Sequence, residues 1–142
     1  MGYAAEEVGL RGSNEIATSF KREGIPVVGV VQFDMTNFKG SEEEIYLFTD
    51  FTNQEQNDFM ALLIDEYVKV GWGRSRCGYA CSDHASWTRA GFRASMPFEA
   101  TMNQMNKNIH TANDTLEVSG RSASHATHFA KLGVSFLVEL AK

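Results

Sequence analysis

The apolar run Val27–Phe33 constrains the fold more than any other segment of the chain. It is rich in valine, follows the turn residues Gly24-Ile25-Pro26 and ends at the acidic Asp34. A short run of this kind, without polar alternation, indicates a strand that is buried on both faces of a sheet. We therefore expect Asp34 to lie at the C-terminal end of a covered strand.

Predicted helices and strands alternate around this run. Apolar spacing predicts helices at about 14–23, 55–69, 82–90 and 124–140, and extended segments at 45–49 and 92–98. Ser13 and Asn14 are candidate caps of the first helix, and Asn53 is the candidate N-cap of the second. Residues 35–44 and 70–81 are predicted loops, and residues 99–116 have no clear period. This order predicts an α/β fold with a partly parallel sheet and helices on its faces.

Length and charge narrow the class of protein. The chain has 142 residues, one domain's length, and 13 Lys+Arg against 18 Asp+Glu give a net charge of −5. Its 43% hydrophobic content is that of a globular protein, and no stretch approaches the ~20 apolar residues of a membrane span. Basic residues are scattered along the chain and form no basic stripe, which argues against nucleic acid as a partner.

Adjacent carboxylates at Glu6 and Glu7 are the first candidates for chemistry. Ligands of open α/β sheets collect at strand ends, where one carboxylate can hold a metal while the other acts on water. The alternative is an acidic helix start, which the helix dipole favours. Asp34 needs a partner such as a cation if it is buried, unless it caps the following turn.

Histidines supply further candidates. His110 lies in a polar segment, where its imidazole is free to bind a metal or to be solvated. His125 and His128 stand at i, i+3 on the last helix, but no carboxylate follows at a matching spacing. We expect these two to be surface or second-layer residues.

The only cysteines, Cys77 and Cys81, stand four residues apart. They form either a local disulfide or half of a metal site, and we favour the disulfide because too few ligands accompany them. A disulfide implies an oxidising compartment, and its small ring would shape the loop that presents Tyr79. Apolar side chains just before His110 are either loop residues packed on the core or the wall of an adaptable pocket. These side chains are Met96, Phe98, Met102, Met105 and Ile109.

Four motifs follow one another along the chain: YAAEEVGLRGS at 3–13, QFDMTN at 32–37, CGYACSDHASW at 77–87 and IHT at 109–111. Together they resemble the secreted bacterial leucyl aminopeptidases, which are two-zinc exopeptidases, and the resemblance covers essentially the whole chain. It implies a three-layer zinc-exopeptidase-like fold. Residues 1–142 would form a single domain, the C-terminal part of a catalytic domain whose sheet is incomplete at its N-terminal side.

The resemblance implies catalytic and metal-binding roles. Glu6 matches the general acid/base, Glu7 and His110 match ligands of one zinc, and Asp34 matches a ligand of the other. In the implied mechanism a metal-bound water attacks the peptide, and Glu6 takes its proton and passes it to the leaving amine. The implied reaction removes hydrophobic N-terminal residues from peptides with a free α-amino group.

Further matches concern the carbonyl and the substrate side chain. Tyr79 matches a residue near the reacting carbonyl, whose oxyanion it would stabilise with the second metal, and Cys77 and Cys81 match the family's disulfide. The remaining matches would line a hydrophobic pocket: Met35, Phe48, Met96, Phe98, Met102, Met105 and Ile109. Relatives often place aromatic residues at positions 102 and 105, so the preference among hydrophobic residues stays open.

One departure from the family pattern concerns the metals. An upstream His-x-Asp histidine and a bridging aspartate are absent, which leaves two ligands for one zinc and one for the other. Catalytic zinc generally takes three protein ligands, so we expect weak zinc binding and little or no peptidase activity from the isolated chain. We expect a fragment of a longer secreted or periplasmic enzyme, whose unpaired central sheet edge favours self-association.

Other interpretations stay open beside the zinc aminopeptidase. A non-catalytic α/β module could use the same surface to bind a peptide or a protein partner. Another zinc exopeptidase-like activity, such as a carboxypeptidase or a glutaminyl cyclase, could use the same fold. The adjacent Glu6-Glu7 pair and the Cys77–Cys81 loop favour the aminopeptidase.

Overall fold

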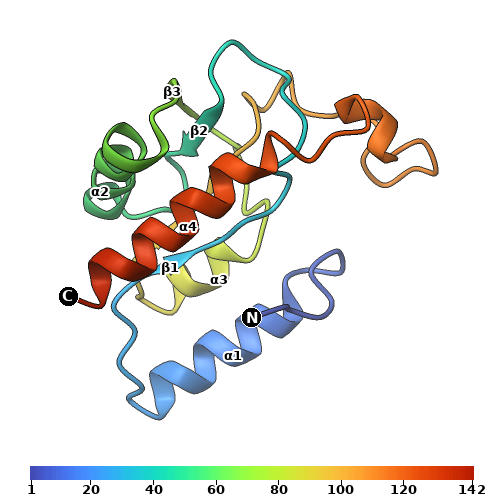
Figure 1. The fold of residues 1–142 in the computed structure, drawn as a ribbon. Coiled ribbons are helices and arrows are strands. Elements are labelled where there is room, and N and C mark those ends of the chain that lie inside the picture. The colour runs from blue at the N-terminus through green and yellow to red at the C-terminus, as the bar shows by residue number, and fades with distance from the viewer.

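Helices and strands alternate along the chain in the computed structural model, which describes all 142 residues. The elements are α1 (Arg11–Arg22), β1 (Val30–Val31), β2 (Ile45–Phe48), α2 (Gln54–Leu63), the π-helical turn η1 (Ile64–Val68), β3 (Trp72–Ser75), α3 (His84–Arg89), β4 (Ala94–Ser95), β5 (Pro97–Phe98), the 3-10 turn η2 (Leu116–Ser119) and α4 (Ala126–Leu140). Figure 1 shows α4 crossing the middle of the molecule, α2 near β2 and α1 at the opposite side. No helix is both long and apolar enough to cross a membrane.

The strands form two small sheets. β1 pairs in parallel with β4, and Val30 lies opposite Ala94. β2 is the central strand of the other sheet, with β3 parallel on one side and β5 antiparallel on the other. A parallel pair needs a crossover connection, which α2 and η1 supply between β2 and β3. The predicted mixed α/β fold with partly parallel sheets is confirmed.

Alternate side chains of β1 face two different helix layers. Val31 packs against a core formed by β2, α2 and α4. Val30 packs against a second core that contains Ala17 of α1 and Trp87 of α3. Because successive side chains of a strand point to opposite faces, helices cover both faces of β1, as a three-layer fold requires.

The strand predicted at 27–33 is shorter and less buried than expected. Only Val30–Val31 forms a strand, which pairs with β4. Val28 is 67% exposed and Phe33 is 40% exposed, so the run is not covered on both faces along its length. The physical reason is that β1 has a neighbouring strand, β4, on one edge only.

A strand also lies inside the predicted loop 70–81. Residues Trp72–Ser75 form β3 and pair in register with β2, from Ile45 opposite Trp72 to Phe48 opposite Ser75. The segment WGRS has weak strand propensity and is half-exposed. Pairing with the fully buried β2 therefore overrides local preference.

The helix starts agree with the sequence only in part. α1 begins at Arg11, and its N-cap is Leu10 rather than Ser13 or Asn14. Ser13 is instead buried, and its hydroxyl donates to the Ser86 hydroxyl on α3 at 2.9 Å. The N-cap prediction for α2 is confirmed, because Asn53 Oδ1 accepts the Gln56 N–H at 2.8 Å.

Candidate active site

One cavity of about 410 Å³ brings together twelve residues that the sequence assigns to catalysis, metal binding or substrate binding. They come from separate segments, and the cavity lies beyond the C-terminal end of β1, where ligands collect in open α/β sheets. The twelve are Glu6, Glu7, Asp34, Met35, Phe48, Tyr79, Met96, Phe98, Met102, Met105, Ile109 and His110. Their individual roles remain predictions.

His110 and Glu7 are in direct contact at the polar side of this site cavity. The Nε2 atom of His110 lies 2.8 Å from Oε1 of Glu7, although the two residues stand over 100 positions apart. Both side chains are about two-thirds exposed, at 66% and 68%. A carboxylate and an imidazole, which are two kinds of metal ligand, therefore meet at a position open to solvent.

Glu6 lies deeper and is surrounded by negative charge. Partial burial raises the pKa of the Glu6 carboxyl, and the nearby charges of Glu7, Asp34 and Asp83 raise it further against the lowering effect of His110. A carboxyl with a raised pKa in a cleft is suited to accept and release a proton. Asp34 is held separately, because its carboxylate accepts the Ser82 hydroxyl at 2.7 Å.

Glu7, Asp34 and His110 have side chains of the types that bind zinc, but they are too few to complete two zinc sites. Carboxylate oxygens and imidazole nitrogens are ordinary zinc ligands, and Glu7 and His110 are close enough to share one ion. No group of three or more His, Cys, Asp or Glu residues in this chain is arranged to hold a metal.

The apolar side of the site cavity is a packed aromatic and methionine surface. Phe48 and Phe98 stack with ring centroids 4.6 Å apart, and both are buried. Met35, Met102 and Met105 pack against this pair while remaining partly accessible. Flexible thioether side chains over a rigid aromatic base form an adaptable pocket for an apolar side chain.

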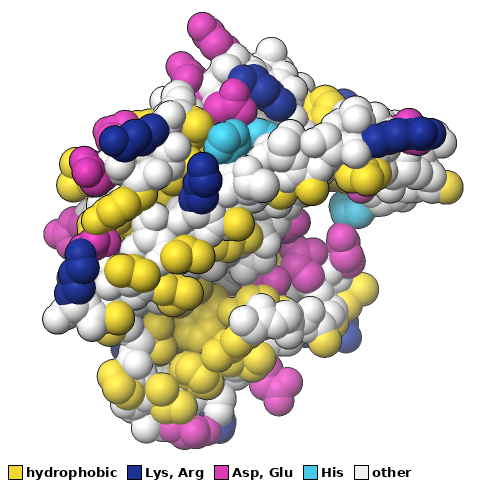
Figure 2. All heavy atoms as spheres, viewed as in Figure 1, with side chains coloured by type: hydrophobic (Ala, Val, Ile, Leu, Met, Phe, Trp, Pro, Cys, Tyr) yellow, Lys and Arg dark blue, Asp and Glu magenta, His cyan; other side chains and the backbone are white.

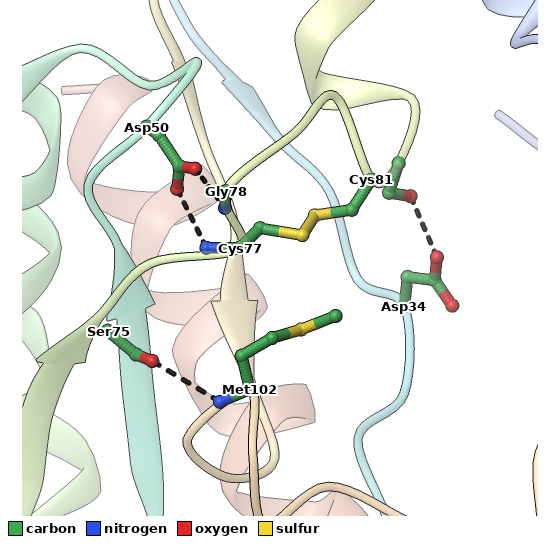
Figure 3. Close-up of a disulfide and its surroundings, with 8 residues drawn as sticks. Asp34, Asp50, Ser75, Cys77, Gly78, Cys81 and Met102 are labelled. Atoms are coloured by element: carbon green, nitrogen blue, oxygen red, sulfur yellow. Dashed lines mark hydrogen bonds between the residues drawn. A yellow bond between two sulfur atoms is a disulfide. The ribbon is translucent and has the colours of Figure 1, made fainter.

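The predicted disulfide is present between Cys77 and Cys81. Asp50 anchors its loop, because the Asp50 carboxylate accepts the N–H groups of Cys77 at 3.0 Å and Gly78 at 2.5 Å (Figure 3). Tyr79, at the tip, is 59% exposed and lines the site cavity. The disulfide and Asp50 together fix where that phenol group is presented.

Left-handed backbone conformations cluster around the site cavity. Ala5, Leu10, Met35 and His110 have φ values between 56° and 62°, and three of the four line the cavity. Such conformations are uncommon for residues other than glycine, and they persist where the surrounding structure imposes them. The segments that carry Glu6, Asp34 and His110 are therefore held by the fold rather than by local preference.

Three buried polar residues near the site were not singled out from the sequence. Asp83 is 4% exposed, and burial together with the Asp34 charge raises the pKa of its carboxyl. His84 is fully buried with no hydrogen bond to either ring nitrogen, and burial lowers its pKa to about 4. The sequence pattern that could have pointed to Asp83 and His84 is the polar run that directly follows Cys81.

The third is Glu99, which ties two site loops together. Its carboxylate accepts the N–H groups of Asn37 at 3.2 Å, Phe38 at 2.9 Å and Asn106 at 3.3 Å. Its own N–H donates to the Met35 carbonyl at 3.2 Å. Burial raises the pKa of Glu99 against these hydrogen bonds. No period in residues 99–116 indicated this role.

His125 and His128 do not line the site cavity. Of the two expected positions, surface or second layer, His125 does not take the surface one: it is buried, and its Nε2 atom lies 2.7 Å from the Glu44 carbonyl oxygen. This contact holds the start of α4 against the loop that precedes β2. The physical reason is that the apolar face of α4 carries His125 into the interior beside Phe129.

Acidic side chains and a histidine beside an apolar pocket in an α/β fold fit the class of metallopeptidases. Residues 1–134 match the model of peptidase family M28, and the chain belongs to that family. It is 40% identical over 139 residues to a probable leucine aminopeptidase of Arthroderma benhamiae, covering 97% of this chain and 37% of that protein. Relatives occur in fungi and in bacteria.

Solved structures support the same family and fold. The LapA aminopeptidase of Legionella pneumophila superposes with a TM-score of 0.92 at 42% identity, over 98% of this chain and 38% of LapA. A zinc aminopeptidase from Bacillus subtilis shares the fold with a TM-score of 0.75 at 19% identity, over 94% of this chain and 34% of that one. This chain thus spans less than two fifths of the length of the proteins that it matches.

Proposed function

We propose that this chain contributes the substrate pocket and part of the metal centre of an aminopeptidase that removes hydrophobic N-terminal residues from peptides. One observation carries the proposal: acidic and imidazole groups line one side of the site cavity, and a stacked Phe48–Phe98 base lines the other. The names of the matched relatives, which are leucine aminopeptidases, agree with it.

Each side chain has a role that suits its position. Glu6 takes a proton from the attacking water and gives it to the leaving amine, which its raised pKa favours. Tyr79 donates a hydrogen bond from its hydroxyl group to the substrate carbonyl oxygen as negative charge develops there. Met35, Met102 and Met105 bind the first side chain of the substrate and exclude water from it.

Zinc is the metal that these donors fit, with Glu7 and His110 on one ion and Asp34 on another. When bound, zinc supplies Lewis-acid polarisation and lowers the pKa of water. Each ion would need further ligands from outside these 142 residues, because one ion would have two protein ligands from this chain and the other would have one. We therefore propose that the isolated chain binds zinc weakly and has little or no peptidase activity.

The disulfide supports a secreted or periplasmic location, since such bonds persist in oxidising compartments. To test this location, the chain would be expressed in a reducing compartment and in an oxidising one. The yield of folded protein and its number of free thiols would be measured for each. Folded protein with two free thiols in its natural compartment would contradict this location.

A chimera tests the proposed activity. The matching 38% of LapA is replaced by this chain, and hydrolysis of leucine p-nitroanilide is measured with zinc present. We expect activity that Glu6→Gln reduces by roughly 10²–10⁴-fold. Glu55→Gln is the matched control, because Glu55 lies on α2 with a side chain that is 80% exposed.

Two results would contradict the proposal. A folded chimera that binds zinc without hydrolysing the substrate would favour the non-catalytic binding module instead. Equal hydrolysis of leucine p-nitroanilide and its N-acetylated form would exclude an exopeptidase that recognises the free α-amino group.

A further inference from the structure

The six methionines of the chain differ in their accessibility to solvent. Met60 and Met96 are buried, at 0% and 1% exposed, and Met1 begins the chain. The other three, which we call the pocket methionines, are partly exposed and line the site cavity: Met35, Met102 and Met105. Beyond the first residue, solvent therefore reaches methionine side chains only in this cavity.

The site cavity is open to small molecules in solution. At its polar side, the Glu7 and His110 side chains are 68% and 66% exposed. Figure 2 shows acidic side chains and a histidine gathered at the right of the molecule, beneath the projecting segment that precedes α4. The pocket methionines pack against Phe48 and Phe98 and border the cavity with their accessible surface. A water-soluble oxidant can therefore reach these side chains without unfolding of the chain.

No cysteine thiol competes for such an oxidant. Cysteine thiolates and methionine thioethers are the sulfur groups that hydroperoxides modify in proteins. Cys77 and Cys81 form the disulfide, and the chain has no free cysteine. The accessible methionines are therefore the sulfur groups that remain open to oxidation.

Hydrogen bonds hold the backbone of Met102 at the cavity wall. Its N–H donates to the Ser75 hydroxyl at 3.3 Å, and its carbonyl oxygen accepts a hydrogen bond from Nζ of Lys107 at 3.3 Å. Figure 3 shows the Met102 side chain extending beneath the disulfide toward Asp34. A change in the polarity of this side chain would therefore be felt inside the pocket.

We infer that the pocket methionines are a modification site for hydroperoxides, and that their oxidation weakens the binding of apolar side chains. The thioether sulfur attacks a peroxide oxygen, so that an S–O bond forms as the O–O bond breaks. The attacked oxygen gives up its proton to the departing oxygen, which leaves as water or an alcohol. Sulfur loses the electron pair that the peroxide gains. The product, methionine sulfoxide, is polar and disrupts apolar contacts. The effect on binding rests on the proposed function, whereas the modification does not.

Peroxide treatment of the isolated chain tests the modification without any need for activity. The chain is exposed to limiting hydrogen peroxide, and peptide mass spectrometry follows the added oxygen atom at each methionine. The pocket methionines should be oxidised roughly tenfold or more faster than the buried Met60 and Met96. Met1, which is 80% exposed, is the reference for a freely accessible thioether. Equal rates at pocket and buried methionines, or a pocket that resists while Met1 reacts, would overturn the inference.

The LapA chimera tests the effect on binding, with each protein compared before and after peroxide treatment. Treatment should raise KM for leucine p-nitroanilide roughly tenfold with a smaller change in kcat, because polar sulfoxides replace apolar contacts. A triple variant with Met35→Leu, Met102→Leu and Met105→Leu has no thioether to oxidise at these positions, so its KM should not change on treatment. Met60→Leu is the matched control, because it alters a buried methionine outside the cavity and should leave the chimera sensitive.

Reversal separates this effect from damage elsewhere in the chimera. Methionine sulfoxide reductases convert the sulfoxide back to the thioether, so they should restore the KM of the treated chimera. An equal rise in KM in the triple variant, or a rise that the reductases do not reverse, would contradict the effect on binding. A chimera that never hydrolyses leucine p-nitroanilide would contradict the proposed function, while the oxidation rates in the isolated chain would still support or overturn the modification site.

Discussion

His110 Nε2 and Glu7 Oε1 lie 2.8 Å apart, although Glu7 belongs to the N-terminal segment before α1 and His110 to the irregular segment between β5 and η2. No helix or strand contains either residue. The contact depends on the packing of the loops around β1 and β5, which sets both side chains at one edge of the site cavity. It supports the proposal that both residues bind one metal ion.

Zinc titration of the isolated chain should depend on this contact. His110→Ala removes one of only two donors, so we expect zinc affinity to fall by roughly tenfold or more. Isothermal titration calorimetry measures this change. His128→Ala, which alters a histidine outside the site cavity, should leave the affinity as it was. Tight binding of two zinc ions by the unaltered chain would contradict the partial ligand set.

Glu99→Gln should destabilise the site loops. The variant keeps one acceptor oxygen but turns an amide NH₂ toward a backbone N–H, so we expect a loss of about 1–3 kcal/mol of unfolding free energy. Urea denaturation gives this value. Glu117→Gln, at an exposed residue of η2, is the control. An unchanged midpoint for Glu99→Gln would show that the buried carboxylate is dispensable.

The stability of the chain should fall with acidity through His84. Its folded pKa is about 4 against an ordinary value of 6.5, so the unfolded chain binds more protons between these values. The free energy of unfolding keeps the full contribution of neutral His84 above pH 6.5. It loses up to roughly 3 kcal/mol as the pH falls toward 4. Unfolding free energies of the unaltered chain and His84→Gln, compared at pH 7 and pH 4.5, isolate this contribution. A difference that does not change with pH would refute it.

Gly12→Ala should displace the segment that carries Glu6 and Glu7. A Cβ atom at position 12 would lie 2.4 Å from the Ala4 carbonyl oxygen, which also accepts the Gly12 N–H. Backbone atoms cannot move aside cheaply, so we expect a cost of roughly 1–3 kcal/mol. Gly2→Ala is the control, because a Cβ there meets nothing within 4 Å. Thermal melts of the two variants should differ, and equal melting temperatures would contradict the close packing at Gly12.

Local chemistry in the sequence was sufficient for some elements. Asn53 has the side chain that an N-cap needs, and the spacing of Phe129, Leu132 and Phe136 places them together on the buried face of α4. The same reasoning failed at β3, where a Gly- and Arg-containing segment becomes a strand only because β2 lies beside it. It also failed at Ser13, which looks like a cap but is buried against Ser86.

The sequence by itself determined the α/β order, the family motifs and the residue types of the site, because each depends on neighbours along the chain. Only the tertiary structure decided that twelve of those residues line one cavity. It also decided that Glu6 lies among three other carboxylates and that one edge of β1 stays unpaired. Charge proximity, burial and strand pairing arise between segments far apart in sequence, and no local pattern encodes them.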